Sequence, residues 1–150
     1  MEAFDVAELP HVKRCIAVSE EAVASGNHPF GALLVHDGAV IAEAENTVVT
    51  ERDPTGHAET NLVRKVGPLL THDELQRSTL YTSTEPCAMC SSAIYWSGIG
   101  RVVYACGEDA LYDIVGPDGP ALRLPCREVF AKAKTPVAVV GPVEQDAACE

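Results

Sequence analysis

Two short segments of the chain carry side chains suited to binding a transition metal. The first reads Gly56-His57-Ala58-Glu59, and the second reads Glu85-Pro86-Cys87-Ala88-Met89-Cys90. One neutral imidazole and two thiolates suit a tetrahedral zinc ion that keeps its fourth position for water. Glu59 follows the histidine by two residues and can move the protons of that water. These residues therefore predict a hydrolytic zinc site.

Cysteines two residues apart have two more common explanations, a structural zinc site and a redox-active dithiol. A structural zinc site usually needs four protein ligands, and the other cysteines are scattered without a second C-x-x-C motif. A redox pair would leave His57 and Glu59 unexplained. Glu59 alone is typical of an acid that complements the dipole at the start of a helix. Its place beside a candidate ligand favours the catalytic interpretation.

Composition bounds the kind of protein. The chain has 150 residues, of which 47% are hydrophobic and 22% charged, as in globular domains. We expect a single domain over residues 1–150, because no repeat or linker divides the chain. No segment approaches the roughly 20 apolar residues of a membrane span, and the acidic N-terminus lacks the features of a signal peptide. We therefore predict a cytoplasmic protein that has no membrane partner.

The net charge weakens the case for a nucleic-acid partner. The chain carries 22 acidic and 11 basic residues, which gives a formal net charge of -11. Proteins usually bind tRNA or DNA through clustered lysine and arginine, and here the basic residues are few and dispersed. An acidic protein can still have one basic face, so the charge lowers this hypothesis rather than removing it. A small neutral substrate fits better.

The elements that must position the metal ligands alternate between helix and strand. Apolar spacing and stop signals predict helices over Val12–Val23, over Ala58–Val66 with His57 in the first turn, and from Pro86 onward. Strands are predicted at Gly31–Val35, Ala39–Ala42, Thr79–Thr82, Arg101–Ala105 and Pro136–Val140. The first two strands flank Asp37-Gly38, a strong hairpin signal. This alternation implies a layered α/β domain.

The motifs resemble the cytidine deaminase-like superfamily, in the branch that holds guanine, cytosine and tRNA adenosine deaminases. The resemblance covers about residues 8 to 113. The matching stretches are Pro29–Ala32, Asn46, Asp53–Glu59, Leu80–Ser83, Glu85–Cys90 and Ala93–Trp96. The resemblance implies a three-layer α/β/α sandwich with a central five-stranded mixed sheet. It also implies one zinc ion per subunit and a homodimer or higher oligomer.

The same resemblance assigns roles to single residues. It implies that zinc is bound by His57, Cys87 and Cys90, and that Glu59 is the proton shuttle. Asn46 would form a hydrogen bond with the substrate base. Asn46 is equally well explained as a turn residue that closes the second strand.

Further substrate contacts are expected around the ring of the base. Phe30 would wall or stack on the ring, and Ala58, Pro86 and Asp113 complete the predicted contacts. Members of this branch often close the pocket with a C-terminal segment. Here Asp113, Tyr112 or Glu144 supplies that base-reading group, or a tail outside this sequence does. For Trp96, by contrast, an ordinary place in the core is the better explanation.

The identity of the substrate is the weakest part of the prediction. Leu80–Ser83 and Ala93–Trp96 most closely resemble guanine deaminases, while the first half resembles tRNA adenosine deaminases nearly as well. The acidic charge favours a free base over tRNA. Among free bases, the resemblance to guanine deaminases predicts guanine. Cytosine, isocytosine, triazines and pterins remain alternatives, as does tRNA adenosine. A catalytically inactive binding module is the alternative from another class, and the intact proton-shuttling carboxylate argues against it.

Overall fold

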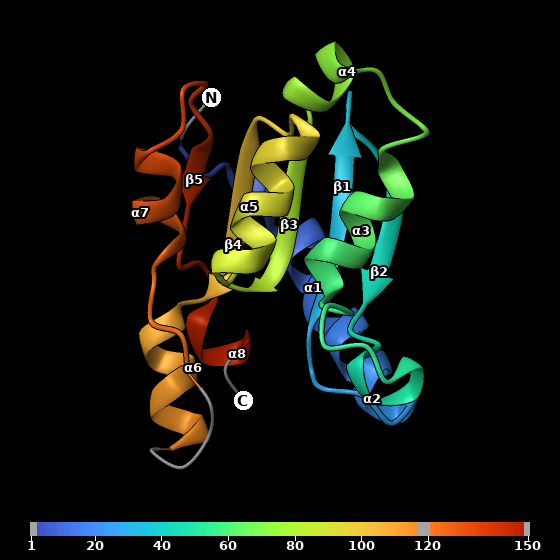
Figure 1. The fold of residues 1–150 in the computed structure, drawn as a ribbon, viewed down its shortest axis with the longest axis vertical. Helices are drawn as coiled ribbons and strands as arrows, with labels where there is room; N and C mark the ends of the chain where they lie inside the picture. Colours follow the sequence, from blue (N-terminus) through green and yellow to red (C-terminus); the bar gives the residue numbers. More distant parts are fainter. Residues whose placement is uncertain (1–2, 117–120, 149–150) are drawn as a thin grey trace.

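A five-stranded mixed sheet forms the centre of the computed structural model, which describes residues 3–116 and 121–148 (Figure 1). The strands are β1 (Gly31–His36), β2 (Ala39–Glu45), β3 (Thr79–Thr84), β4 (Arg101–Cys106) and β5 (Ala138–Val140). Their order across the sheet is β2-β1-β3-β4-β5. β1 runs antiparallel to β2 and β3, whereas β3, β4 and β5 run parallel. The predicted mixed sheet is confirmed.

Helices cover both faces of this sheet and complete the three layers. They are the 3-10 helix η1 (Val6–Glu8) and the α-helices α1 (Leu9–Ala24), α2 (Val48–Glu51), α3 (Ala58–Val66), α4 (His72–Gln76), α5 (Ala88–Ser97), α6 (Glu108–Val115), α7 (Cys126–Ala131) and α8 (Gln145–Ala148). In Figure 1, α3 and α5 lie in front of the sheet and α1 lies behind it. The predicted three-layer α/β/α class is therefore confirmed.

Two apolar clusters hold the layers together, one on each face of the sheet. Leu34 of β1 packs with Leu62 of α3 and Ile94 of α5 on one face. Leu33 belongs to the cluster of the opposite face, together with Val12 of α1. All six residues of β1 are buried. A strand covered on both faces reads as a continuous apolar run, which explains why the sequence of β1 lacks alternation.

The hairpin between β1 and β2 forms at the predicted dipeptide. Asp37 has φ 50° and Gly38 has φ 78°, so both central residues adopt the left-handed backbone that a tight primed turn requires. The expected strand at Ala39–Ala42 extends to Glu45. This extension brings the end of β2 next to the segment that precedes α3.

The helices that carry the metal ligands begin slightly later than the sequence predicts. His57 is the N-cap of α3, with φ -72° and ψ 150°, rather than a residue of its first turn. Cys87 is the N-cap of α5, with φ -69° and ψ 174°, so Pro86 lies before the helix rather than at its first position. The extended backbone at each cap lets the ligand side chain leave the helix end. Among residues 3–116 and 121–148, no helix is long and apolar enough to cross a bilayer.

Candidate metal centre

The three predicted metal ligands meet where α3 and α5 begin. Nδ1 of His57 lies 3.5 Å from Sγ of Cys87 and 3.6 Å from Sγ of Cys90. The ligand atoms of the three residues all lie within 4.8 Å of one another. Bond lengths of roughly 2.0–2.1 Å to nitrogen and 2.3 Å to sulfur, with tetrahedral angles, separate nitrogen from sulfur by about 3.5–3.6 Å. The observed spacing fits a tetrahedral zinc ion.

The packing of the two helices on the sheet explains why their first turns coincide. Ala58 at the start of α3 is fully buried, and Leu62 and Ile94 fix α3 and α5 against the same face of the sheet. Both helices therefore present their N-terminal ends to one point. The positive ends of the two helix dipoles favour thiolates and developing negative charge at that point.

The two cysteines differ in how readily they ionise. A hydrogen bond from the Cys90 thiol is the main cause that lowers the pKa of Cys87 to about 4, and His57 acts in the same direction. The hydrogen bond to Cys87 and burial raise the pKa of Cys90. Metal binding needs both sulfurs as thiolates, so we expect zinc uptake by this site to release protons.

A hydroxyl that the sequence did not single out lies against the more buried sulfur. Thr60 Oγ1 is 3.2 Å from Sγ of Cys90. Thr60 lies three residues after His57, a spacing that places two side chains on one side of a helix start. This spacing from His57 was the signal in the sequence that could have identified Thr60. A hydroxyl donor at this distance favours the thiolate form of Cys90.

Glu59 is buried next to the ligands, with 6% of its surface exposed. Burial is the main cause that raises the pKa of its carboxyl to about 7, and the Cys87 thiolate adds to the effect. An acid with a pKa near neutrality can both accept and return a proton under physiological conditions. The structure thus gives Glu59 the burial and surroundings that a proton shuttle needs.

Asn46 follows β2 and closes the turn toward α2. Its Oδ1 accepts a hydrogen bond from the backbone N–H of Val48 at 3.0 Å, as the turn interpretation predicts. The backbone N–H of Asn46 donates to the backbone carbonyl of Phe30 at 3.1 Å. Phe30 is partly buried and packs on the cluster shared with α3. The second of these bonds joins Asn46 to Phe30, while the contacts of both residues with a substrate stay predictions.

Asn61 is a second polar residue of this region that sequence reasoning missed. Its Nδ2 donates to the carbonyl of Glu45 at 3.0 Å and to Oγ1 of Thr47 at 2.9 Å. These bonds fasten α3 to the end of β2 and to the turn that contains Asn46. No local motif could reveal them, because the partners are 14 and 16 residues away along the chain.

The remaining predicted residues occupy different surroundings. Pro86 is buried beside Cys87, whereas Asp113 is exposed on α6. The expectation that Trp96 belongs to the core is wrong, because 80% of its surface is exposed. The ring contacts Tyr95 edge-on at a centroid distance of 5.1 Å. Trp96 occupies the outer side of α5, while Ile94 takes the buried side.

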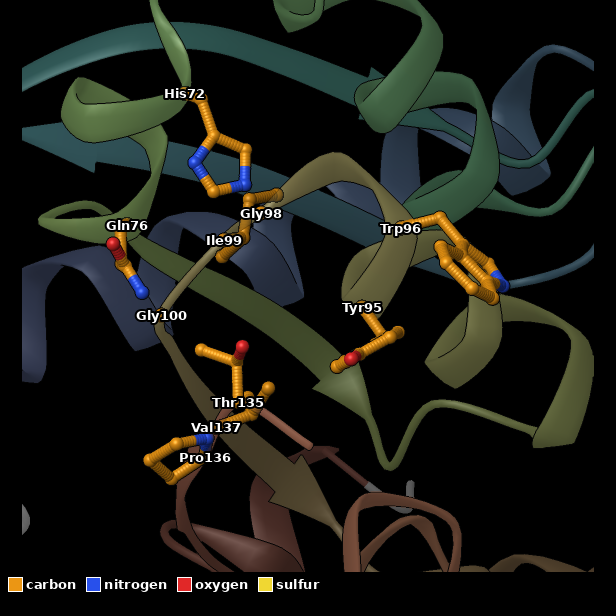
Figure 2. A pocket seen from close by; sticks show the side chains of 10 residues that line it. All are labelled: His72, Gln76, Tyr95, Trp96, Gly98, Ile99, Gly100, Thr135, Pro136 and Val137. Carbon is orange, nitrogen blue, oxygen red and sulfur yellow. The ribbon is translucent and has the colours of Figure 1, made fainter. Parts of the chain in front are cut away.

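A cavity of about 170 Å³ lies at the far end of α5 from Cys87 (Figure 2). Its lining includes His72 of α4, Tyr95 of α5 and Val137 before β5. The lining contains none of the predicted metal or substrate residues. This cavity is therefore separate from the metal centre.

The sequence comparison defines the class of protein to which this fold and site belong. Residues 8–106 match the family described as the cytidine and deoxycytidylate deaminase zinc-binding region. The chain belongs to this family, whose members are hydrolases that cleave C–N bonds of nucleobases and nucleosides. The predicted superfamily, the hydrolase class and the zinc cofactor are confirmed.

Three similar proteins are deaminases of three different bases. A probable cytosine deaminase of Schizosaccharomyces pombe is 38% identical over 143 residues, which cover 94% of this chain and 87% of that protein. Guanine deaminase of Bacillus subtilis is 47% identical over 95 residues, 63% of this chain and 61% of that protein. A tRNA-specific adenosine deaminase of Haemophilus influenzae is 36% identical over 98 residues, 65% of this chain and 57% of that protein.

A solved structure supports the same assignment. The guanine deaminase of Nitrosomonas europaea superimposes with a TM-score of 0.77 at 28% sequence identity. The superposition covers 93% of this chain and 79% of that one. The fold is therefore shared over nearly the whole chain.

Proposed function

We propose that this protein deaminates a free nucleobase and that guanine is its preferred substrate. The observation that carries the chemistry is the buried carboxyl of Glu59 beside a site of one imidazole and two thiolates. The segment that is 47% identical to a guanine deaminase supports guanine. The acidic net charge of -11 supports a free base over a polyanionic substrate.

The residues of the site divide the work of hydrolysis. His57, Cys87 and Cys90 would hold zinc, which would supply a Lewis acid that makes water a nucleophile near neutral pH. Glu59 takes a proton from the attacking water and delivers it to the ring nitrogen of the base. Glu59 also passes the second proton to the exocyclic amine, which leaves as ammonia while the ring carbon becomes a carbonyl.

The walls of the site orient the base. We assign Asn46 to a hydrogen bond with the ring edge and Phe30 to the face of the ring. Their backbone hydrogen bond supports this pairing, because it fixes one residue relative to the other. Ala58 and Pro86 contribute close contacts beside the ligands, and Asp113 on α6 is assigned to the far edge of the base.

The proposal includes a homodimer in the cytoplasm. The exposed Trp96, which contacts Tyr95 on α5, supports a subunit contact, since tryptophan and tyrosine are enriched at protein–protein interfaces. Sedimentation velocity at micromolar concentration tests this part. A species with twice the mass of the chain is expected, and a monomer across the concentration range would contradict it.

Ammonia release from a panel of bases tests the substrate. Zinc-loaded protein is assayed with guanine, cytosine, isocytosine and adenine, with their nucleosides, and with a tRNA anticodon hairpin. We expect the highest kcat/KM for guanine. Turnover confined to the hairpin, or silence across the panel with zinc bound, would overturn the proposal of a free base.

Cytosine is the second candidate, and one observation favours it. The probable cytosine deaminase of S. pombe aligns with 94% of the chain, a longer match than that to guanine deaminase. The same assay distinguishes the two, because a preference for cytosine over guanine would transfer the assignment to this alternative.

A further inference from the structure

Glu85 lies between the end of β3 and the metal ligand Cys87, and both of its carboxylate oxygens accept hydrogen bonds from the backbone. Oε1 accepts the N–H of Glu108 at 2.9 Å, and Oε2 accepts the N–H of Cys126 at 2.8 Å. The N–H of Glu85 itself donates to the carbonyl of Cys106 at 2.7 Å. One residue thus joins the metal-binding segment to three other points of the chain.

The two donors are the first residues of two helices. Glu108 begins α6, and Cys126 begins α7. The side chain of Glu108 in turn accepts the N–H of Leu124 at 3.0 Å through Oε1. Because the N–H groups at a helix start lack partners within their own helix, a carboxylate there forms strong charge-assisted bonds. Glu85 therefore holds the starts of α6 and α7 together.

The start of α6 lies close to the metal-binding segment, because the N–H of Glu108 is bonded to Glu85, two residues before Cys87. In Figure 1 α6 extends beyond the ends of β3 and β4 at which α5 begins. Burial is the main cause that raises the pKa of Tyr112 on α6, and the Cys87 thiolate contributes. The hydroxyl of Tyr112 donates to the carbonyl of Leu122 at 3.3 Å.

We propose that Glu85 is a positioning residue for the deamination. By tying Glu108 and Cys126 to the residue that precedes Pro86 and Cys87, it fixes α6 as one wall of the substrate pocket. Glu85 touches neither the metal nor the reacting atoms in this role. The inference rests on the proposed function. It assigns Glu85, the residue before Pro86, a role that is separate from metal binding.

Replacing the carboxylate by an amide tests this role. Glu85→Gln keeps the shape but offers one acceptor atom to two N–H donors, so α6 loses part of its anchoring. We expect KM for the preferred base to rise about tenfold, kcat to change by less than about threefold, and zinc content to stay at one per chain. Amide hydrogen exchange at Glu108 and Cys126 is expected to accelerate in the same variant.

Glu128→Gln is the matched control, because Glu128 is an exposed acid in the first turn of α7. It is expected to keep the KM and the exchange rates of the wild type. If Glu85→Gln fails to fold, Glu85→Asp is measured in the same way, with a smaller rise in KM expected. An unchanged KM, or a fall in kcat together with loss of zinc, would overturn the positioning role.

The two levels of the proposal can fail separately. Wild-type protein that releases no ammonia from any base overturns the proposed function, and the role of Glu85 in that reaction with it. In that case, hydrogen exchange in Glu85→Gln still tests whether Glu85 anchors α6 and α7. Turnover by the wild type with an unaltered KM in Glu85→Gln overturns only the inference about Glu85.

Discussion

At the residue scale, the proposed hydrolysis depends on the carboxyl of Glu59, to which we assign no metal-binding role. Glu59 lies two residues after a ligand, in the first turn of α3, where its side chain is removed from water. A structural zinc site has no use for such an acid. Its burial beside the ligands therefore connects the metal centre to hydrolysis rather than to folding alone.

Removing the acidity of Glu59 should abolish turnover while sparing the metal. In Glu59→Gln we expect kcat to fall about 100- to 10,000-fold, because positioned proton transfer contributes that much. Zinc content by atomic emission should equal that of the wild type, since His57, Cys87 and Cys90 are intact. Glu51→Gln, at an exposed acid of α2, is the control and should retain full activity. Normal turnover in Glu59→Gln would refute the mechanism.

At the scale of the elements, two contacts place helices against the sheet. One is between α1 and β1, and the other is between η1 and β4. The first is a close approach of backbones. A Cβ at Gly31 would lie 2.7 Å from the carbonyl oxygen of Cys15 and 2.7 Å from the nitrogen of Ser19. The second is an ion pair between Glu8 and Arg101, supported by a hydrogen bond from the hydroxyl of Tyr81 to Glu8 at 2.6 Å.

The close approach predicts that Gly31 tolerates no side chain. Gly31→Ala should lower the free energy of unfolding by about 2–3 kcal/mol, because rigid backbone atoms must move to admit the methyl group. Gly67→Ala is the control: its φ is -50° and its added Cβ would meet only Val63, at 3.4 Å. That change should fall within about 0.5 kcal/mol of the wild type in urea unfolding. Equal stability of the two variants would contradict the packing of α1 on β1.

The ion pair predicts a stability that depends on pH. Burial alone would raise the pKa of Glu8, but hydrogen bonds from Arg101 and Tyr81 overcome it and lower the pKa from 4.5 to about 2. Since the folded pKa is depressed, the stabilisation is complete above pH 4.5 and is lost as the pH falls toward 2. We expect Glu8→Gln to cost about 2 kcal/mol at pH 7.

Urea unfolding of both proteins at several pH values measures this effect. The difference between wild type and Glu8→Gln should shrink steadily below pH 4.5. A second variant, Glu20→Gln, changes an exposed acid of α1 and should leave the pH dependence of the wild type in place. A difference that stays constant between pH 7 and pH 3 would show that the charge of Glu8 contributes little.

At the scale of the whole molecule, the charge of -11 governs which partners can approach. Long polyanions gain affinity by releasing counterions from clustered basic side chains, and an acidic surface opposes that gain. The same charge has little effect on a neutral base. The overall electrostatics are therefore consistent with the free base that we propose as substrate.

This balance predicts negligible binding of tRNA. Fluorescence anisotropy with a labelled anticodon hairpin should give no saturation below roughly 100 μM protein at about 150 mM salt, which is the weak end of non-specific binding. The affinity for the free base should change little with salt. Micromolar binding of the hairpin that weakens steeply as salt increases would instead indicate a basic face hidden in the total charge.

The sequence by itself determined the candidate ligand set and the order of elements, because both depend on local spacing. The spacing of Cys87 and Cys90 predicts that both sulfurs face one metal, since residues three apart share a helix face, and Asp37-Gly38 turns the chain through its own backbone preferences. The apolar runs also predicted all five strands. That residues 1–150 form one domain stays a prediction.

Only the tertiary structure decided which side chains are buried and which distant groups meet. Trp96 is exposed although its type suggests core, and Glu85 binds the starts of α6 and α7 although no motif connects them. Asn61 and Thr60 likewise acquire their roles from partners on other elements. Local preferences act over a few residues, whereas burial and long-range hydrogen bonds exist only after the helices have packed on the sheet. Packing therefore decides what surrounds the metal, while short motifs decide what binds it.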